Sequence, residues 1–207
     1  MALTEWIAAA LGLVTVALVV RRSVWNYPFA LAMVSLYFFV FWEAKLYSDA
    51  LLQIFFLAIN LYGWRNWLRS REASGEVVVT TLTARERVLW LAGTVLASLA
   101  WGYAMATFTD AAAPVPDALI AGGSVAAQIL QARRRLECWV LWIAVDLIAV
   151  PLYWSRDLEP TAALYTVFLV MAAAGLVSWR KAWRATQSGA NPSLARVPTP
   201  SVLTAKE

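Results

Sequence analysis

Residues 46–67, LYSDALLQIFFLAINLYGWRNW, and residues 158–179, LEPTAALYTVFLVMAAAGLVSW, follow one apolar pattern. A shift of 112 residues (158 − 46) aligns the two stretches without a gap. The same shift places Arg21-Arg22 on Arg133-Arg134 and Trp42 on Trp154. The further identities are Leu46/Leu158, Ala50/Ala162, Leu52/Leu164, Phe56-Leu57/Phe168-Leu169, Gly63/Gly175 and Trp67/Trp179. This ungapped match predicts an internal repeat.

The repeated stretch is long and apolar enough to cross a bilayer, for which roughly 20 apolar residues suffice. The whole chain of 207 residues is 61% hydrophobic and 14% charged, which is too apolar for an ordinary soluble domain. The composition therefore predicts an all-α membrane protein. Its seven expected transmembrane helices cover about 4–20, 25–42, 47–64, 88–108, 117–132, 137–154 and 160–179. Residues 65–87 are expected to form a polar loop, and residues 185–207 a disordered cytoplasmic tail.

Positive residues predict the orientation of the chain. The N-terminus and the loops after the second, fourth and sixth spans hold only Lys45 and Arg156. The other fifteen of the 17 Lys and Arg residues lie on the opposite side. Positive loops stay in the cytoplasm, so we expect the N-terminus outside and the C-terminus inside.

The repeat predicts the organisation of a transmembrane domain over residues 1–184. Repeat one covers 4–67, a linking helix covers 88–108, and repeat two covers 117–184. One linking helix between two three-helix repeats makes both copies enter from the same side, which gives a SWEET-like 3+1+3 parallel repeat. In such proteins the substrate binds between the halves near the middle of the membrane.

Several functional classes are disfavoured by composition. The chain has one cysteine, Cys138, and no histidine, so we expect no disulfide, no metal site and no cofactor, and no set of catalytic residues. The net charge of +4 comes from clusters between the spans, which is a topology pattern. The expected partners are the lipid bilayer and a small molecule, not nucleic acid, while a homo-oligomer is left open.

Polar side chains at membrane depth usually face a cavity or a partner. Gln53 and Asn60 lie seven residues apart on one helix face. The candidate substrate-binding residues are Gln53, Asn60, Gln128, Trp139, Trp142, Asp146 and Tyr165. Each also has a structural alternative: the amides can join helices, Asp146 can pair with an arginine or a tyrosine, and Trp139 can anchor the helix at the interface.

The chain resembles the PnuC family of vitamin transporters over residues 5–184. The resemblance lies in L-Y-x-D-x-x-L-Q-x-x-F and N-x-Y-G-W in the first half, and in W-x-x-W-x-x-x-D followed by L-Y in the second. It implies a SWEET-like fold and uptake of nicotinamide riboside by facilitated diffusion through a bacterial inner membrane. It also implies ligand contacts from Gln53, Asn60, Trp142, Asp146 and Tyr165, with Gln128 as a further candidate. Asp146 stands where some nicotinamide riboside carriers have Asn.

The same resemblance leaves other ligands open. A thiamine or riboflavin carrier of the family is the first alternative, because an acid such as Asp146 suits the thiamine cation as well as the nicotinamide ring. A membrane assembly subunit that transports nothing is the alternative from another class.

Overall fold

The computed structural model describes residues 3–43, 47–109 and 113–189, and this part of the chain is helical throughout its regular structure. The helices are α1 (Leu3–Val20), α2 (Asn26–Glu43), α3 (Tyr47–Ser74), α4 (Ala84–Phe108), α5 (Pro114–Ala132), α6 (Cys138–Trp154) and α7 (Glu159–Gln187). The prediction of an all-α chain with seven helices is therefore confirmed within the described ranges.

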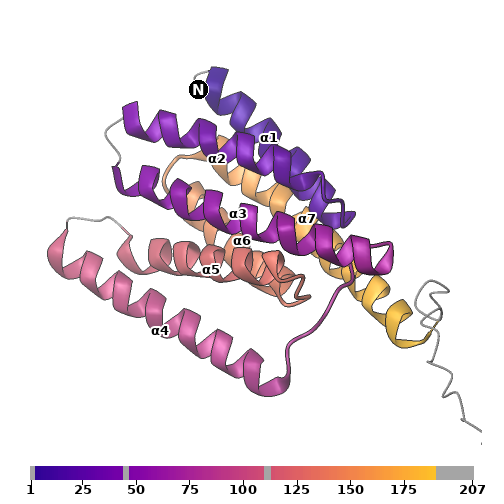
Figure 1. Cartoon of the computed structure of the whole chain (residues 1–207). Helices are drawn as coiled ribbons and strands as arrows, with labels where there is room; N and C mark the ends of the chain where they lie inside the picture. The colour runs from indigo at the N-terminus through magenta and orange to yellow at the C-terminus, as the bar shows by residue number, and fades with distance from the viewer. Residues whose placement is uncertain (1–2, 44–46, 110–112, 190–207) are drawn as a thin grey trace, which may run out of the picture.

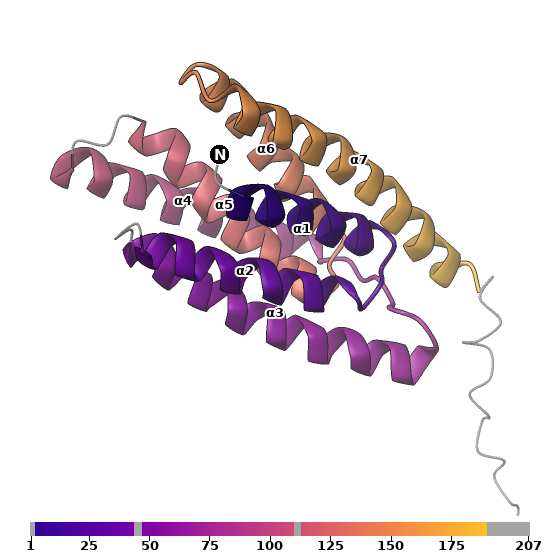
Figure 2. The same ribbon diagram turned by 90° about the horizontal axis from the view of Figure 1, so that it is seen from above.

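The helices form two groups of three with α4 at the edge. Helices α1, α2 and α3 pack in chain order, as do α5, α6 and α7, and α4 packs against α5. The two groups meet where α1 contacts α7 and where α3 contacts α5. Figures 1 and 2 show all seven helices running roughly alongside one another, with α4 on the outside.

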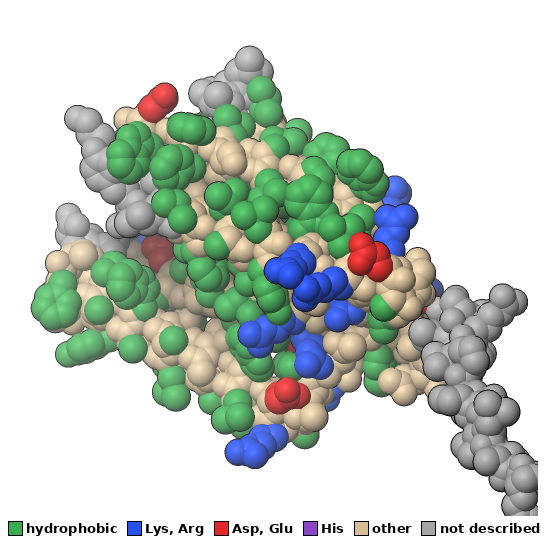
Figure 3. Space-filling model, in the orientation of Figure 1, with side chains coloured by type: hydrophobic (Ala, Val, Ile, Leu, Met, Phe, Trp, Pro, Cys, Tyr) green, Lys and Arg blue, Asp and Glu red, His purple; other side chains and the backbone are tan. Residues whose placement is uncertain are grey.

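Apolar side chains cover much of the surface. Within the described residues, two helices are long and apolar enough, by length and composition alone, to cross a membrane: α4 with 25 residues and α7 with 29 residues. The apolar stretches Trp6–Val20, Asn26–Val40 and Cys138–Trp154 are shorter. Figure 3 shows hydrophobic side chains over most of the visible face, with Lys and Arg gathered at one end.

Helix bounds differ from the expected spans mainly at this arginine-rich end, where α1, α3, α5 and α7 end and α4 begins. Helix α3 runs to Ser74, so the predicted loop 65–87 shrinks to residues 75–83. Helix α4 begins four residues earlier than expected because Thr83 and Glu86 form a reciprocal capping box. Helix α7 continues to Gln187, and residues 190–207 of the expected tail lie outside the described residues.

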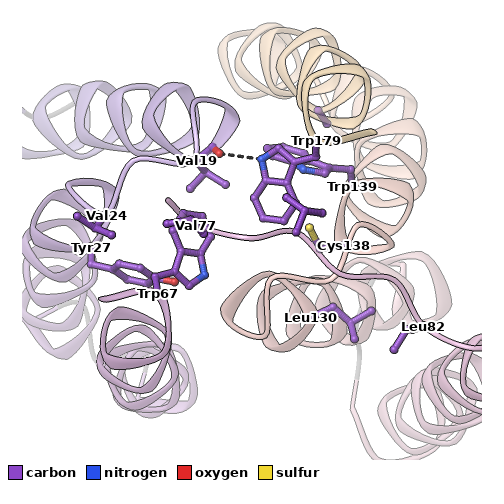
Figure 4. Close-up of a cluster of buried hydrophobic side chains, with 12 residues drawn as sticks. Val19, Val24, Tyr27, Trp67, Val77, Leu82, Leu130, Cys138, Trp139 and Trp179 are labelled. Atoms are coloured by element: carbon purple, nitrogen blue, oxygen red, sulfur yellow. Dashed lines mark hydrogen bonds between the residues drawn. The ribbon is translucent and has the colours of Figure 1, made fainter. Parts of the chain in front are cut away.

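Residues 75–83, which we call the strap, cross the arginine-rich end between the two groups of helices (Figure 4). The side chains of Val77, Val79 and Leu82 are buried there in one hydrophobic cluster with residues of both groups. The strap also pairs with the turn after α5: the Thr80 amide donates to the Arg134 carbonyl at 3.0 Å, and the Leu136 amide donates to the Thr80 carbonyl at 2.9 Å. The polar loop expected from the sequence is thus a packed, hydrogen-bonded segment.

Hydrogen bonds join the two groups of helices in pairs, and the 112-residue shift converts one bond of each pair into the other. The Trp67 indole donates to the Gln131 carbonyl at 3.1 Å, and the Trp179 indole donates to the Val19 carbonyl at 3.0 Å. Adding 112 converts Trp67 into Trp179 and Val19 into Gln131. Each bond therefore runs from one group to the other, and each is the counterpart of the other.

Further pairs follow the same relation. The ring of Tyr27 meets Trp67 edge-on at 5.4 Å and 89°, and Trp139 meets Trp179 at 5.5 Å and 87°. Asn66 donates to the Ala132 carbonyl as Ser178 donates to that of Val20. Even the left-handed backbone recurs, at Arg22 (φ 55) and Arg134 (φ 60). The same local geometry is built twice.

Candidate functional site

A polar contact joins the two groups of helices where α3 packs against α5. The side-chain amide of Gln128 donates to the Asn60 side-chain oxygen at 3.0 Å, and the Asn60 amide donates to the Phe56 carbonyl at 2.8 Å. Both side chains are buried, with 4% of Asn60 and 8% of Gln128 exposed. Buried amides are costly unless they are hydrogen-bonded, so this pair is either a helix-to-helix lock or a pair of groups that a ligand can engage.

One turn further along α5, Gln131 binds Trp142, another of the predicted site residues. The Trp142 indole of α6 donates to the Gln131 side-chain oxygen at 3.0 Å, and the Gln131 backbone carbonyl accepts from Trp67. Gln131 is buried and lies three residues after Gln128, on the same helix face. It thereby fixes the orientation of the Trp142 ring relative to the amide pair.

Asp146 lies one turn beyond Trp142 on α6 and is 3% exposed. Val145, the residue before it, belongs to a hydrophobic cluster against which Tyr165 of α7 packs. The Tyr165 ring lies 5.1 Å from Tyr153 and 6.0 Å from Phe168. Asp146 and Tyr165 therefore lie on two helices that pack against each other, away from the arginine-rich end of α6.

Two predicted residues stand apart from these contacts. Trp139 is 1% exposed and lies in the tryptophan cluster of Figure 4, edge-on to Trp179 and against Gly175. Its indole nitrogen has no hydrogen-bond partner among the described residues. Gln53, two turns before Asn60 on α3, is half-buried.

The sequence reasoning missed Gln131 and the strap. Gln131 follows Gln128 at a helical spacing, so the signal was present, but it stands beside the three arginines 133–135. In the strap, the run Val77-Val78-Val79 was the available signal. Arg22 and Arg134, which the repeat relates, both donate to strap carbonyls: Arg22 to Val77 and Arg134 to Val78, each at 3.4 Å.

The electrostatics of the arginine-rich end depend on this burial. Burial is the largest cause of a lowered pKa of the Arg134 guanidinium, followed by the positive charge of Arg135. Arginine stays protonated at physiological pH in any case. Among the residues that the structure describes, no group of three His, Cys, Asp or Glu residues could hold a metal ion.

Two hollows open on the described surface, and other residues line both. One, of about 470 Å³, lies between α4 and α5 and includes Trp90, Ser98 and Gly122. The other, of about 320 Å³, lies at the arginine-rich end around Arg22 and Glu76. Neither of these two hollows is lined by Asn60 or Gln128, whose side chains bond to each other.

Two groups of three helices, apolar outer surfaces and a polar contact buried between the groups define a helical membrane protein. Over residues 2–181 the chain matches the model of the nicotinamide mononucleotide transporter family. The chain belongs to that family. The resemblance to PnuC transporters is confirmed, and the chain is a membrane transporter and not an enzyme.

Characterised relatives of two kinds are similar to this chain. It is 29% identical over 198 residues to the riboflavin/roseoflavin transporter RibM of Streptomyces davaonensis, covering 94% of this chain and 91% of RibM. It is 26% identical over 203 residues to the nicotinamide riboside transporter PnuC of Escherichia coli, covering 84% and 85%. A crystal structure of the vitamin B3 transporter PnuC matches with a TM-score of 0.68 and 28% identity, over 86% of this chain and 80% of that one.

Proposed function

We propose that this protein takes up nicotinamide riboside by facilitated diffusion. The observation that carries the proposal is the buried polar contact between Asn60 and Gln128, which joins the two groups of helices one turn from Gln131, the hydrogen-bond partner of Trp142. Membership of the transporter family and the likeness to PnuC of Escherichia coli, named a nicotinamide riboside transporter, support it.

We propose that the protein is a SWEET-like 3+1+3 parallel repeat, in which α1–α3 and α5–α7 are the halves and α4 is the link. The paired indole bonds of Trp67 and Trp179 support it, because a parallel repeat brings equivalent residues of both halves into equivalent contacts. By the positive-inside rule the arginine-rich end faces the cytoplasm of a bacterial inner membrane, and the N-terminus lies outside.

The ligand replaces the hydrogen bond that Gln128 donates to Asn60. The amides of Asn60, Gln128 and Gln53 bind the ribose hydroxyls or the carboxamide. The rings of Trp142 and Tyr165 enclose the nicotinamide ring, and the Asp146 carboxylate complements its positive charge. Trp139 remains a candidate with less support, because it packs against Gly175 and Trp179.

Alternating access would have to open the arginine-rich end, which the strap closes. The strap fills the space between the halves there, and Arg22 and Arg134 hold it from equivalent positions. Rocking of the halves toward an open cytoplasmic side requires the strap to separate from at least one of them. The structure then corresponds to a state closed to the cytoplasm.

Riboflavin is the second candidate ligand, and the likeness to RibM over 94% of the chain favours it. Riboflavin is neutral and larger than nicotinamide riboside, so its binding should not need the Asp146 carboxylate. A membrane assembly subunit would bind neither vitamin.

Binding of nicotinamide riboside, thiamine and riboflavin to the purified protein, measured side by side by isothermal titration, separates these functions. We expect saturable binding of nicotinamide riboside, weakened by Asp146→Asn. Tighter binding of riboflavin that Asp146→Asn leaves unchanged would make the protein a riboflavin carrier, and binding of none of the three would overturn the transport proposal.

A further inference from the structure

A polar hollow of about 320 Å³ lies at the arginine-rich end, where the strap leaves α3. It is lined by Arg21, Arg22, Ser23, Val24, Trp25, Arg71, Gly75, Glu76 and Val77. The walls come from two segments that are distant in sequence: the turn after α1, and the end of α3 with the start of the strap. The hollow is thus part of the junction that holds the strap to the first half.

Positive charge exceeds negative charge in this hollow. Arg22 binds the strap: it forms an ion pair with Glu76 at 3.2 Å and donates to the Val77 carbonyl at 3.4 Å. Arg21 and Arg71 make no ion pair among the residues that the structure describes. Three arginines and one glutamate thus line the hollow, and the surplus positive charge favours an added anion.

The backbone fixes this arrangement without the help of the arginine side chains. Arg22 and Gly75 have left-handed backbone conformations, with φ of 55° and 74°, which turn the chain sharply at both edges of the hollow. The Ser70 hydroxyl accepts from the Val78 amide at 3.0 Å and donates to the Glu76 carbonyl at 3.4 Å. The strap is thus anchored to α3 on both sides of Val77 by bonds that involve no arginine.

The second half repeats the arginine pair but not the other residues that line the hollow. The 112-residue shift converts Arg71 into Trp183, which packs against the tryptophan cluster. It converts Trp25 into Glu137, which pairs with Arg87 at 2.9 Å. The third arginine of the hollow, Arg71, is therefore not part of the repeated sequence.

We propose that this hollow binds the phosphate group of a phosphate monoester, and that the bound anion loosens the strap. Guanidinium groups bind phosphate oxygens in pairs of parallel hydrogen bonds, and Arg21, Arg22 and Arg71 supply the donors. The anion competes with Glu76 for Arg22 and repels the Glu76 carboxylate. The first-half anchor of the strap weakens, which connects occupancy of the hollow to opening of the arginine-rich end.

The effect on transport rests on the proposed function, whereas binding and strap mobility can be measured without it. The full chain is titrated with adenosine 5′-monophosphate and with inorganic phosphate in detergent, and is placed in nanodiscs of phosphatidylcholine with and without phosphatidic acid. The first two arms supply a soluble phosphate and the last a lipid headgroup. Amide hydrogen exchange of residues 76–79 is followed in each arm.

We expect saturable binding in at least one monoester arm, an affinity about tenfold lower in Arg71→Gln, and faster exchange of the strap amides on binding. Arg85→Gln is the matched control, because it removes an exposed arginine from the same end of the molecule outside the hollow. The proposal is overturned by absence of binding, by equal loss in both variants, or by binding that leaves strap exchange unchanged. Equal melting temperatures of parent and variants establish that the fold is intact.

Discussion

Replacement of Gly175 by alanine tests the packing by which the second half holds its tryptophan cluster. A Cβ atom at Gly175 would lie 2.5 Å from Cη2 and Cζ2 of Trp139 and 2.6 Å from Cε2. Trp139 is 1% exposed and lies edge-on to Trp179 at 5.5 Å. The indole ring therefore has no free space to move into, and α6 and α7 must separate locally.

The expected cost combines two opposing effects. Overpacking of a well-packed core costs about 1–3 kcal/mol. Alanine in a helix is favoured over glycine by about 0.5–1 kcal/mol. Because a Cβ 2.5 Å from a rigid indole is a severe clash, the upper part of the first range applies, about 2–3 kcal/mol. The net destabilisation is then about 1–2.5 kcal/mol, which lowers the melting temperature by about 2–10 °C for a chain of this size.

The assay is thermal unfolding of the purified protein in one detergent, with Gly93→Ala as the control. An added Cβ at Gly93, in the middle of α4, meets no heavy atom within 4 Å. Gly93→Ala should therefore melt at the parent temperature or slightly above it. A Gly175→Ala protein that melts like the parent, or an equal loss in Gly93→Ala, would refute the packing argument.

Three other substitutions test the repeat, the site and the strap. Trp67→Phe and Trp179→Phe each remove one indole hydrogen bond between the halves, so both should lose a similar free energy of unfolding, about 1 kcal/mol; clearly unequal losses by thermal unfolding would count against equivalent roles. Asn60→Ala should weaken nicotinamide riboside binding about tenfold in isothermal titration, whereas an unchanged Kd would remove Asn60 from the site. Val79→Ala removes two buried methyl groups, and hydrogen exchange of the strap should be about tenfold faster; unchanged exchange would mean that Val79 does not hold the strap.

The sequence predicted the helices well because their apolar runs are long and the polar loops are short. It failed at the end of α3, where RNWLRSREAS reads as a polar loop. The helix continues there because Trp67 and Ser70 face inward: Trp67 contacts Tyr27 and Trp179, and Ser70 bonds the strap. Hydropathy averages over a window and does not detect one buried face of a polar helix.

The candidate site was predictable in its residue types but not in its pairing. Helical spacing places Gln53 and Asn60 on one face of α3. It does not predict which face of α3 packs against α5. The bond between Asn60 and Gln128 depends on that packing. The role of Gln131 depends on the contact of α5 with α6, and spacing along one helix cannot supply it.

Exchange of labelled nicotinamide riboside across liposomes that contain the purified protein tests the central claim most directly. With no ion gradient, facilitated diffusion predicts that labelled vitamin equilibrates across the membrane, and that unlabelled vitamin inside the liposomes accelerates its entry. Asn60→Ala should slow this exchange. Accumulation that appears only when a proton gradient is imposed, or absence of nicotinamide riboside exchange in liposomes that exchange riboflavin, would contradict the account.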